Sequence, residues 1–146
     1  MLSHLIQLFT RDLDRLKDEL NAYSNEADLW KLSGSINNTP GNLALHLIGN
    51  LNHFIGSKLG NTGYVRDRPA EFADKNIPLA DLTQMINATK TMLTTTLSGL
   101  NHDDLEKPFV IENFNETPTT GFWLIHLTTH LNYHLGQINY HRRMIK

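Results

Sequence analysis

The sequence contains no cysteine, which excludes disulfide bonds, thiolate zinc sites and a cysteine nucleophile. Valine occurs only at Val65 and Val110, against 23 leucines, and this balance favours helices because β-branched side chains prefer strands. The formal net charge is −2, so no excess of basic side chains attracts nucleic acid or an anionic membrane. No apolar run approaches the roughly 20 residues that span a bilayer.

The N-terminal region does not read as a signal peptide, because five charged residues between positions 11 and 17 interrupt its apolar stretch. A length of 146 residues with 40% hydrophobic and 19% charged side chains fits one globular domain, residues 1–146. We therefore expect a soluble, cytoplasmic protein that binds neither nucleic acid nor a membrane.

Four segments carry apolar residues at helical spacing, namely about Leu2–Tyr23, Pro40–Leu59, Leu79–Leu97 and Thr120–Met144. Thr39 is placed to cap the second helix, with Pro40 at its first position and Gly60 at its end. Residues 25–38, 60–78 and 101–118 are predicted loops, and the middle one is a long crossover. The pattern predicts an all-α, up-and-down-like four-helix bundle.

Three of the 8 histidines follow one another at intervals of four in the last helix: His126, His130 and His134. Each adjacent pair can share one metal ion, whereas the outer two lie about 12 Å apart along the axis. A helical wheel centred on the leucines of this segment places His134 nearest the buried stripe, His130 at its edge and His126 toward solvent. The favoured metal-binding pair is therefore His130 and His134.

A third ligand must come from another helix. The second helix offers His46 and His53 on a polar strip beside its leucines, and only one of them can reach a given ion because they are two turns apart. Clustered helix histidines are more often surface or hydrogen-bonded core residues than ligands, so the spacing leaves both interpretations open. His4, His102 and His141 are expected at the surface.

Three segments of the chain resemble a known group of proteins. They are Gly41–Leu51 (GNLALHLIGNL), Arg66–Phe72 (RDRPAEF) and His130–Gln137 (HLNYHLGQ). Together with the helix order, they resemble the DinB/YfiT-like superfamily of metal-dependent four-helix bundles, and the resemblance covers nearly the whole chain. It implies a bundle with a long crossover between the second and third helices.

The resemblance also implies a site and an activity. The histidine triad of the superfamily falls on His46, His130 and His134, with a divalent transition metal as cofactor: zinc or nickel first, iron or manganese as alternatives. It implies a homodimer. Some members transfer low-molecular-weight thiols to electrophiles, so a thiol transferase or a hydrolase acting on a small molecule is expected. The alternative is a non-catalytic metal- or ligand-binding homodimeric module.

The remaining polar residues of these segments allow two interpretations each. Gly136 is interpreted first as a helix-packing residue and otherwise as one that makes room beside the metal ligands, and Gln137 as a surface residue or a hydrogen-bond partner of a ligand. The charges from Arg66 to Glu71 are interpreted as a solvated or loop-ordering ion-pair group, unless Arg66 or Arg68 folds back to bind an anionic substrate. No carboxylate is securely placed near the triad, and Tyr133 and Asn50 are the nearest polar side chains by helical position.

Overall fold

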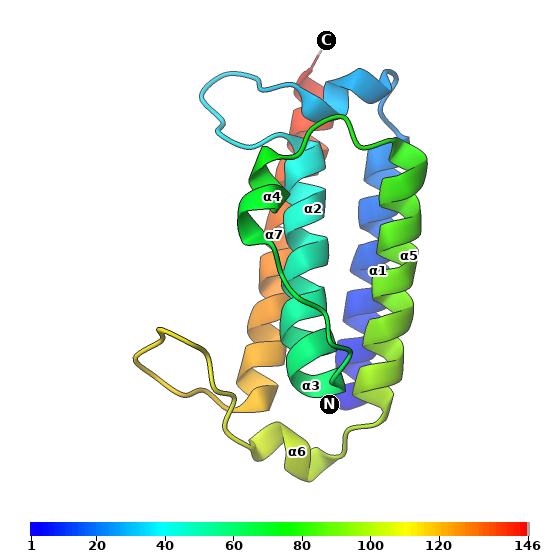
Figure 1. The fold of residues 1–146 in the computed structure, drawn as a ribbon. Coiled ribbons are helices and arrows are strands. Elements are labelled where there is room, and N and C mark those ends of the chain that lie inside the picture. Colours follow the sequence, from blue (N-terminus) through cyan, green and yellow to red (C-terminus); the bar gives the residue numbers. More distant parts are fainter. Residues whose placement is uncertain (146) are drawn as a thin grey trace.

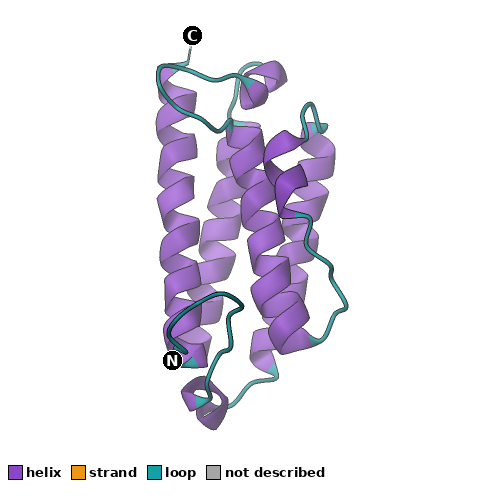
Figure 2. Ribbon diagram, turned by 60° about the vertical axis from the view of Figure 1, so that its left-hand side comes forward, coloured by secondary structure: helices purple, strands orange, loops and turns teal. Residues whose placement is uncertain are grey.

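The computed structural model describes residues 1–145, and in that range the chain consists of helices joined by loops (Figure 1, Figure 2). The only β-type pairing among these residues is an isolated bridge between Pro108 and Thr119. No helix in this range combines the length and the apolar character that crossing a membrane requires. The prediction of an all-α fold is confirmed.

Four long helices form the bundle: α1 (Leu2–Asn21), α2 (Pro40–Leu51), α5 (Leu79–Ser98) and α7 (Thr120–Met144). The predicted start of α2 is confirmed, because the side chain of Thr39 accepts a hydrogen bond from the Asn42 N–H and Pro40 takes the first helical position. The helix continues beyond its α-helical part through a π-helical segment, η2 (Asn52–Ser57), and a last turn, α3 (Lys58–Gly60). It ends near Gly60 as predicted, although the π-helical segment was not expected.

The three predicted loops each contain a short helix that the sequence analysis did not predict: η1 (Glu26–Trp30), α4 (Arg68–Ala73) and α6 (His102–Glu106). These helices are too short to produce a periodic apolar pattern. Their start signals are nevertheless present, because the side chains of Asn25, Asp67 and Asn101 each cap the helix that follows. The long crossover between α3 and α5 is confirmed, and α4 lies within it (Figure 1).

Side-chain pairs between the helices fix their directions. Asp14 with Lys90 and Lys17 with Asn87 join α1 to α5 in opposite senses, whereas Asp12 with Asn132 and Glu19 with Asn139 join α1 to α7 in the same sense. The crossover returns the chain to the end where α2 began, so α2 and α5 run parallel (Figure 1). The prediction that the four helices alternate in direction is therefore wrong for α2 and α5, which run in the same direction. A crossover long enough to span the bundle removes the need for consecutive helices to be antiparallel.

The bundle interior is built mainly from leucine, and all twelve residues of α2 are buried. Helices α4, α5 and α7 all contact α2, which explains why no side of it faces water. The polar strip of α2, which includes Asn42, His46 and Asn50, is consequently inside the protein. A buried polar strip requires partners from the surrounding helices, because unpaired polar groups are costly in a core.

Candidate metal centre

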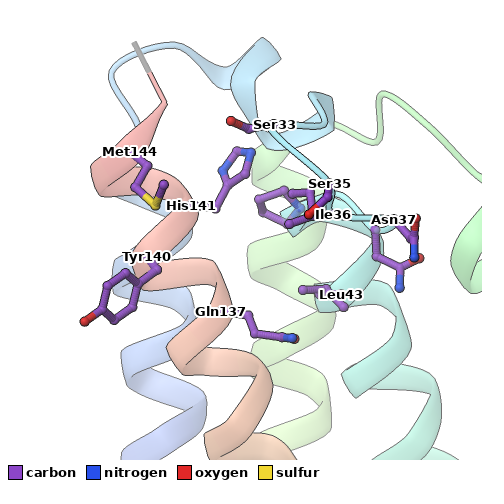
Figure 3. A pocket seen from close by; sticks show the side chains of 11 residues that line it. Ser33, Ser35, Ile36, Asn37, Leu43, Gln137, Tyr140, His141 and Met144 are labelled. Atoms are coloured by element: carbon purple, nitrogen blue, oxygen red, sulfur yellow. The ribbon is translucent and has the colours of Figure 1, made fainter.

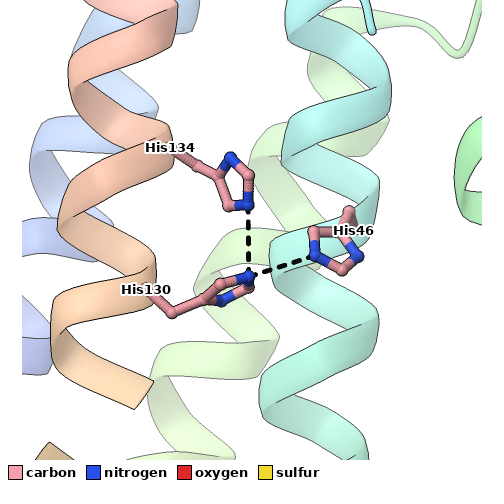
Figure 4. Close-up of side chains that lie close together, drawn as sticks. All are labelled: His46, His130 and His134. Carbon is pink, nitrogen blue, oxygen red and sulfur yellow. Dashed lines mark hydrogen bonds between the residues drawn. The ribbon is translucent and has the colours of Figure 1, made fainter. Parts of the chain in front are cut away.

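Three imidazole rings converge between α2 and α7. The Nε2 atom of His130 lies 3.2 Å from Nε2 of His46 and 3.1 Å from Nε2 of His134 (Figure 4). One ligating nitrogen of each residue lies within 4.8 Å of the others. His46 is 6% exposed, and the other two are partly buried. The three residues singled out from the sequence are thus neighbours in space.

The other candidate histidines lie outside this cluster. His53, which the sequence left as an alternative to His46, packs its ring against Phe54 at 4.8 Å and does not reach α7's histidines. His126 is exposed, as the helical wheel predicted, and its ring stacks on Trp123 at 4.6 Å. Its ring centre is 6.5 Å from that of His130, so it borders the cluster without joining it.

Two of the three rings have a partner on the nitrogen that faces away from the cluster. Nδ1 of His46 is 3.0 Å from Oε1 of Glu71, and Nδ1 of His134 is 2.7 Å from Oε1 of Gln137. Glu71 and Gln137 accept through these oxygens. Nδ1 of His46 also lies 3.3 Å from Nη2 of Arg66, but that nitrogen donates at the shorter distance of 2.9 Å to Glu71. We therefore assign the hydrogen to each Nδ1, so that each Nε2 presents a lone pair to the centre. Nδ1 of His130 is buried and has no hydrogen-bond partner. The amide of Gln137 therefore acts as a partner of a ring nitrogen, which was one of its two interpretations.

Glu71, which the sequence placed only in a charged loop, is the carboxylate beside the cluster. It is 6% exposed, and Arg66 donates to both of its oxygens, Nε to Oε2 at 2.8 Å and an Nη to Oε1 at 2.9 Å. Gly49 on α2 makes room for this carboxylate, because a Cβ at that position would collide with it. The absence of a side chain at Gly49, one turn after His46, was the available signal for a close approach.

The charged segment around α4 contains an ion pair between Arg66 and Glu71 that orders the crossover, as one of the two interpretations expected, whereas Asp67 and Arg68 are exposed. Arg66 reaches the cluster, and its guanidinium is committed to Glu71. Arg68 lies over the ring of Phe72, 5.4 Å from its centre, and Phe72 in turn packs against His46. Because Arg66 is engaged with Glu71, it is not a free cation for an anionic substrate.

The surroundings of His130 and His134 keep these two imidazoles neutral. Burial, followed by the nearby His134 and His46, lowers the pKa of His130 to about 4. Burial also lowers the pKa of His134, despite the opposing hydrogen bond of Gln137. Burial alone would raise the pKa of Glu71, but the hydrogen bonds from His46 and Arg66 outweigh it and lower that pKa. At neutral pH the site thus combines unprotonated imidazoles of His130 and His134 with an ionised carboxylate of Glu71.

The geometry suits a metal ion. Two nitrogens that each lie about 2.1 Å from one ion are separated by about 3.0 to 3.4 Å, and the two measured Nε2 separations fall in that range. Without a cation, His46 and His134 both present acceptors to a single nitrogen of His130, which can carry at most one hydrogen. A cation would satisfy all three lone pairs, so the residues fit a divalent metal.

Two expectations about other residues are corrected. His141, expected at the surface, is buried, with Nδ1 2.8 Å from the Tyr23 hydroxyl and Nε2 2.9 Å from the Lys31 carbonyl oxygen. These two partners satisfy both ring nitrogens, so burial costs little. Gly136, interpreted first as a helix-packing residue, is not required for packing within the chain, because a Cβ there would meet no atom within 4 Å.

A hollow of about 440 Å³ lies between the N-terminal end of α2, the C-terminal end of α7 and the loop that precedes α2 (Figure 3), and none of the three clustered histidines lines it. Gln137 lines it, and the same side chain accepts the hydrogen bond from His134. Leu43, one turn before His46, and Met144 add apolar surface, and Ser33 and Asn37 add polar atoms from the loop. No Asp, Glu, Lys or Arg lines this hollow. It is of a size that small-molecule sites commonly have.

An all-α bundle with three converging imidazoles on two of its helices can hold a divalent metal. Residues 1–146 match the family described as "Protein of unknown function (DUF1572)", and the chain belongs to that family. It is a DinB/YfiT-like family, which confirms the resemblance seen in the sequence. No curated protein matches the chain.

One solved structure, the crystal structure of the conserved protein of locus from Enterococcus faecalis, resembles this chain with a TM-score of 0.77 and 16% sequence identity. The likeness covers 98% of this chain and 95% of that chain. At this identity the similarity concerns the fold.

Proposed function

We propose that His46, His130 and His134 bind one divalent transition metal, zinc or nickel in the first place and iron or manganese as alternatives. The proposal rests on the hydrogen bonds of the outer ring nitrogens. Glu71 and Gln137 hold two imidazoles in the tautomer whose Nε2 lone pair faces the third ring. Because the pKa of His130 is low, this ring binds a metal ion at neutral pH without first losing a proton.

We further propose that the protein is a metal-dependent transferase, of the kind that joins a thiol to an electrophile, or a hydrolase acting on a small molecule. When bound by three neutral imidazoles, a divalent ion retains its full charge and an open position, which lowers the pKa of a bound water or thiol. The chain itself orients the rings through Glu71 and Gln137. The hollow that Gln137 lines, which has no Asp, Glu, Lys or Arg in its lining, favours an uncharged portion of the substrate.

One observation favours the second candidate, a non-catalytic metal- or ligand-binding module. Among residues 1–145, Glu71 is the carboxylate that hydrogen-bonds to the cluster, and both of its oxygens are engaged by His46 and Arg66. It contacts the outer nitrogen of His46 and is held away from the Nε2 side. General acid–base chemistry would then have to use a group other than this carboxylate.

Metal analysis of protein purified without a nickel column tests the binding proposal. We expect about one equivalent of metal in the native protein and in His126→Ala, whose ring borders the cluster. We expect His134→Ala to bind more than about 100-fold more weakly, since losing even an indirect partner of a ligand costs about 10- to 100-fold. Equal, stoichiometric metal in the two variants would contradict the ligand assignment.

Screening of the metal-loaded protein tests the catalytic half of the proposal. Pairs of small thiols and electrophiles, and small esters and amides, serve as substrates, with His134→Ala as the blank. Turnover that disappears in this variant supports an enzyme. Metal bound at full stoichiometry, with no turnover and no exchange of the remaining ligand, favours the non-catalytic module.

A further inference from the structure

Asn42 is the most deeply buried polar side chain of α2, with none of its surface exposed. Its amide nitrogen donates to the main-chain oxygens of Glu71 at 3.0 Å and Asp74 at 2.8 Å, in the segment that carries α4. Its amide oxygen accepts from the Thr39 hydroxyl at 2.6 Å and from the Lys75 ammonium. All four hydrogen bonds that an amide side chain can make are therefore formed.

The partners of Asn42 fix the orientation of its amide. The Thr39 hydroxyl accepts from the Asn42 main-chain N–H, so its own hydrogen is free to point to the amide oxygen. If the oxygen and nitrogen of the amide exchanged places, the NH₂ group would face the Lys75 ammonium, which has no acceptor, and the oxygen would face two carbonyl oxygens. Asn42 must therefore present its two donors to the segment that carries α4.

This segment is also the one that delivers Glu71 to the cluster. Helix α4 has only six residues and lies beside α2 (Figure 1). Isolated helices of that length are not stable in water, and the last main-chain oxygens of a helix lack partners within it. Asn42 supplies the partner of the Glu71 oxygen, and His46, one turn later on α2, donates to the Glu71 carboxylate. One side of α2 thus holds Glu71 by its main chain and by its side chain.

Arg66 cannot replace the contact that Asn42 makes. Its guanidinium donates to both carboxylate oxygens, but Arg66 belongs to the same crossover, five residues before Glu71. It therefore holds the carboxylate relative to the crossover and not relative to α2. Among residues 1–145, the hydrogen bonds that join α2 to Glu71 come from Asn42 and His46.

We propose that Asn42 is a positioning residue of the metal centre: it holds the main chain of Glu71 against α2 and so sets the hydrogen bond from His46 to Glu71 and the affinity for the metal. Because the main chain of Glu71 is already fixed, little conformational entropy is lost when its side chain accepts from His46. The inference rests on the proposed metal site. It adds to that site a residue that hydrogen-bonds to none of the three histidines.

A double-mutant cycle tests the proposal on the whole chain. Competition with a fluorescent chelator measures Zn²⁺ binding by the native protein, Asn42→Ala, Glu71→Ala and the double variant. We expect Asn42→Ala to bind Zn²⁺ about 3- to 10-fold more weakly, which corresponds to the loss of one net hydrogen bond. In the Glu71→Ala background the same change should alter the affinity less than about 2-fold, because its target is absent. Losses that multiply in the double variant overturn the proposal, as does native affinity in Asn42→Ala.

Asn52→Ala is the matched control. The amide nitrogen of Asn52 also donates twice, to the Ile48 main-chain oxygen and the Thr89 hydroxyl, both at 2.9 Å, but it joins the helix to α5. Its loss should leave Zn²⁺ affinity within about 2-fold of native. Asn42→Asp keeps the size and the acceptor of the side chain and removes both donors. It should weaken Zn²⁺ binding, although its added negative charge would by itself attract the cation.

Hydrogen exchange of the metal-free protein gives an answer that does not depend on the metal. Peptides from α4 should exchange faster in Asn42→Ala and Asn42→Asp than in the native protein, and at the native rate in Asn52→Ala, whereas peptides from α1 keep the native rate in all three. Unchanged exchange of α4 in both Asn42 variants overturns the positioning role, and so does faster exchange throughout the bundle. If the native protein binds no Zn²⁺, the proposed function fails, and this comparison still decides whether Asn42 holds Glu71 in place.

Discussion

At the scale of single residues, the properties of the histidine cluster depend on the atoms that face away from it. His46 and His134 have acceptors on their outer nitrogens, Glu71 and Gln137, whereas the outer nitrogen of His130 has none. An acceptor on Nδ1 directs the lone pair of Nε2 inward and raises the ring's strength as a ligand. Glu71 is the stronger of the two acceptors because it is ionised and held by Arg66.

Removing the carboxylate should therefore weaken metal binding without touching a ligand. We expect Glu71→Ala to lower metal affinity by about 10- to 100-fold, and Glu71→Gln to lower it less, because the amide oxygen can still accept from His46. Competition with a fluorescent chelator measures both constants, and Glu106→Ala, at an exposed position, is the control. Unfolding is followed in parallel because Arg66 loses its partner. Native affinity in folded Glu71→Ala would contradict the role assigned to Glu71.

The sequence predicted the positions of the histidines better than those of their partners. A helical wheel was enough to turn His130 and His134 inward, because both lie on the same regular helix as the buried leucines. The choice of His46 over His53 needed the family resemblance. Glu71 lies 25 residues from His46 in a segment without periodicity, and only folding of the crossover brings the two together. His141 was placed wrongly because its two partners come from distant parts of the chain.

At the scale of elements, the crossover does more than connect two helices. It carries α4, which covers α2 and delivers Glu71 to it, and Gly49 permits the close approach. The sequence predicted the long helices because each repeats its apolar pattern over several turns. It did not predict α4 or η2, because a helix of six residues and a π-helical segment leave no such pattern.

Two glycine substitutions distinguish the effect on stability of the close contact between α2 and α4 from the effect of helix propensity. Gly49→Ala should lower the free energy of unfolding by about 1 to 3 kcal/mol, because its Cβ displaces the Glu71 carboxylate. Gly136→Ala, the same change in open space on α7, should raise it by up to about 1 kcal/mol when both are measured at low protein concentration. Urea unfolding gives both values. Equal effects of the two substitutions would mean that α4 moves away from α2 at little cost.

At the scale of the whole molecule, the helix directions explain where the site lies. Because α2 and α7 are neighbours, residues 84 positions apart meet in one cluster. The sequence predicted four helices and a long crossover. The crossover is long enough to span the bundle, and this length allows α2 and α5 to run parallel. Helix count alone does not determine direction, since bundles with long connections occur in several orders.

Burial of neutral histidines should make the metal-free fold sensitive to mild acid. The pKa of His130 is about 4 in the native protein and about 6.5 in the unfolded chain. Between these values the unfolded state binds more protons, so the free energy of unfolding must fall as the pH decreases from about 6.5 to 4. Urea unfolding of chelator-treated protein across this range measures the slope. His130→Leu should flatten this slope, and the control His102→Leu, at an exposed position, should not. Coinciding slopes for the native protein and His130→Leu would show that the fold does not hold His130 neutral.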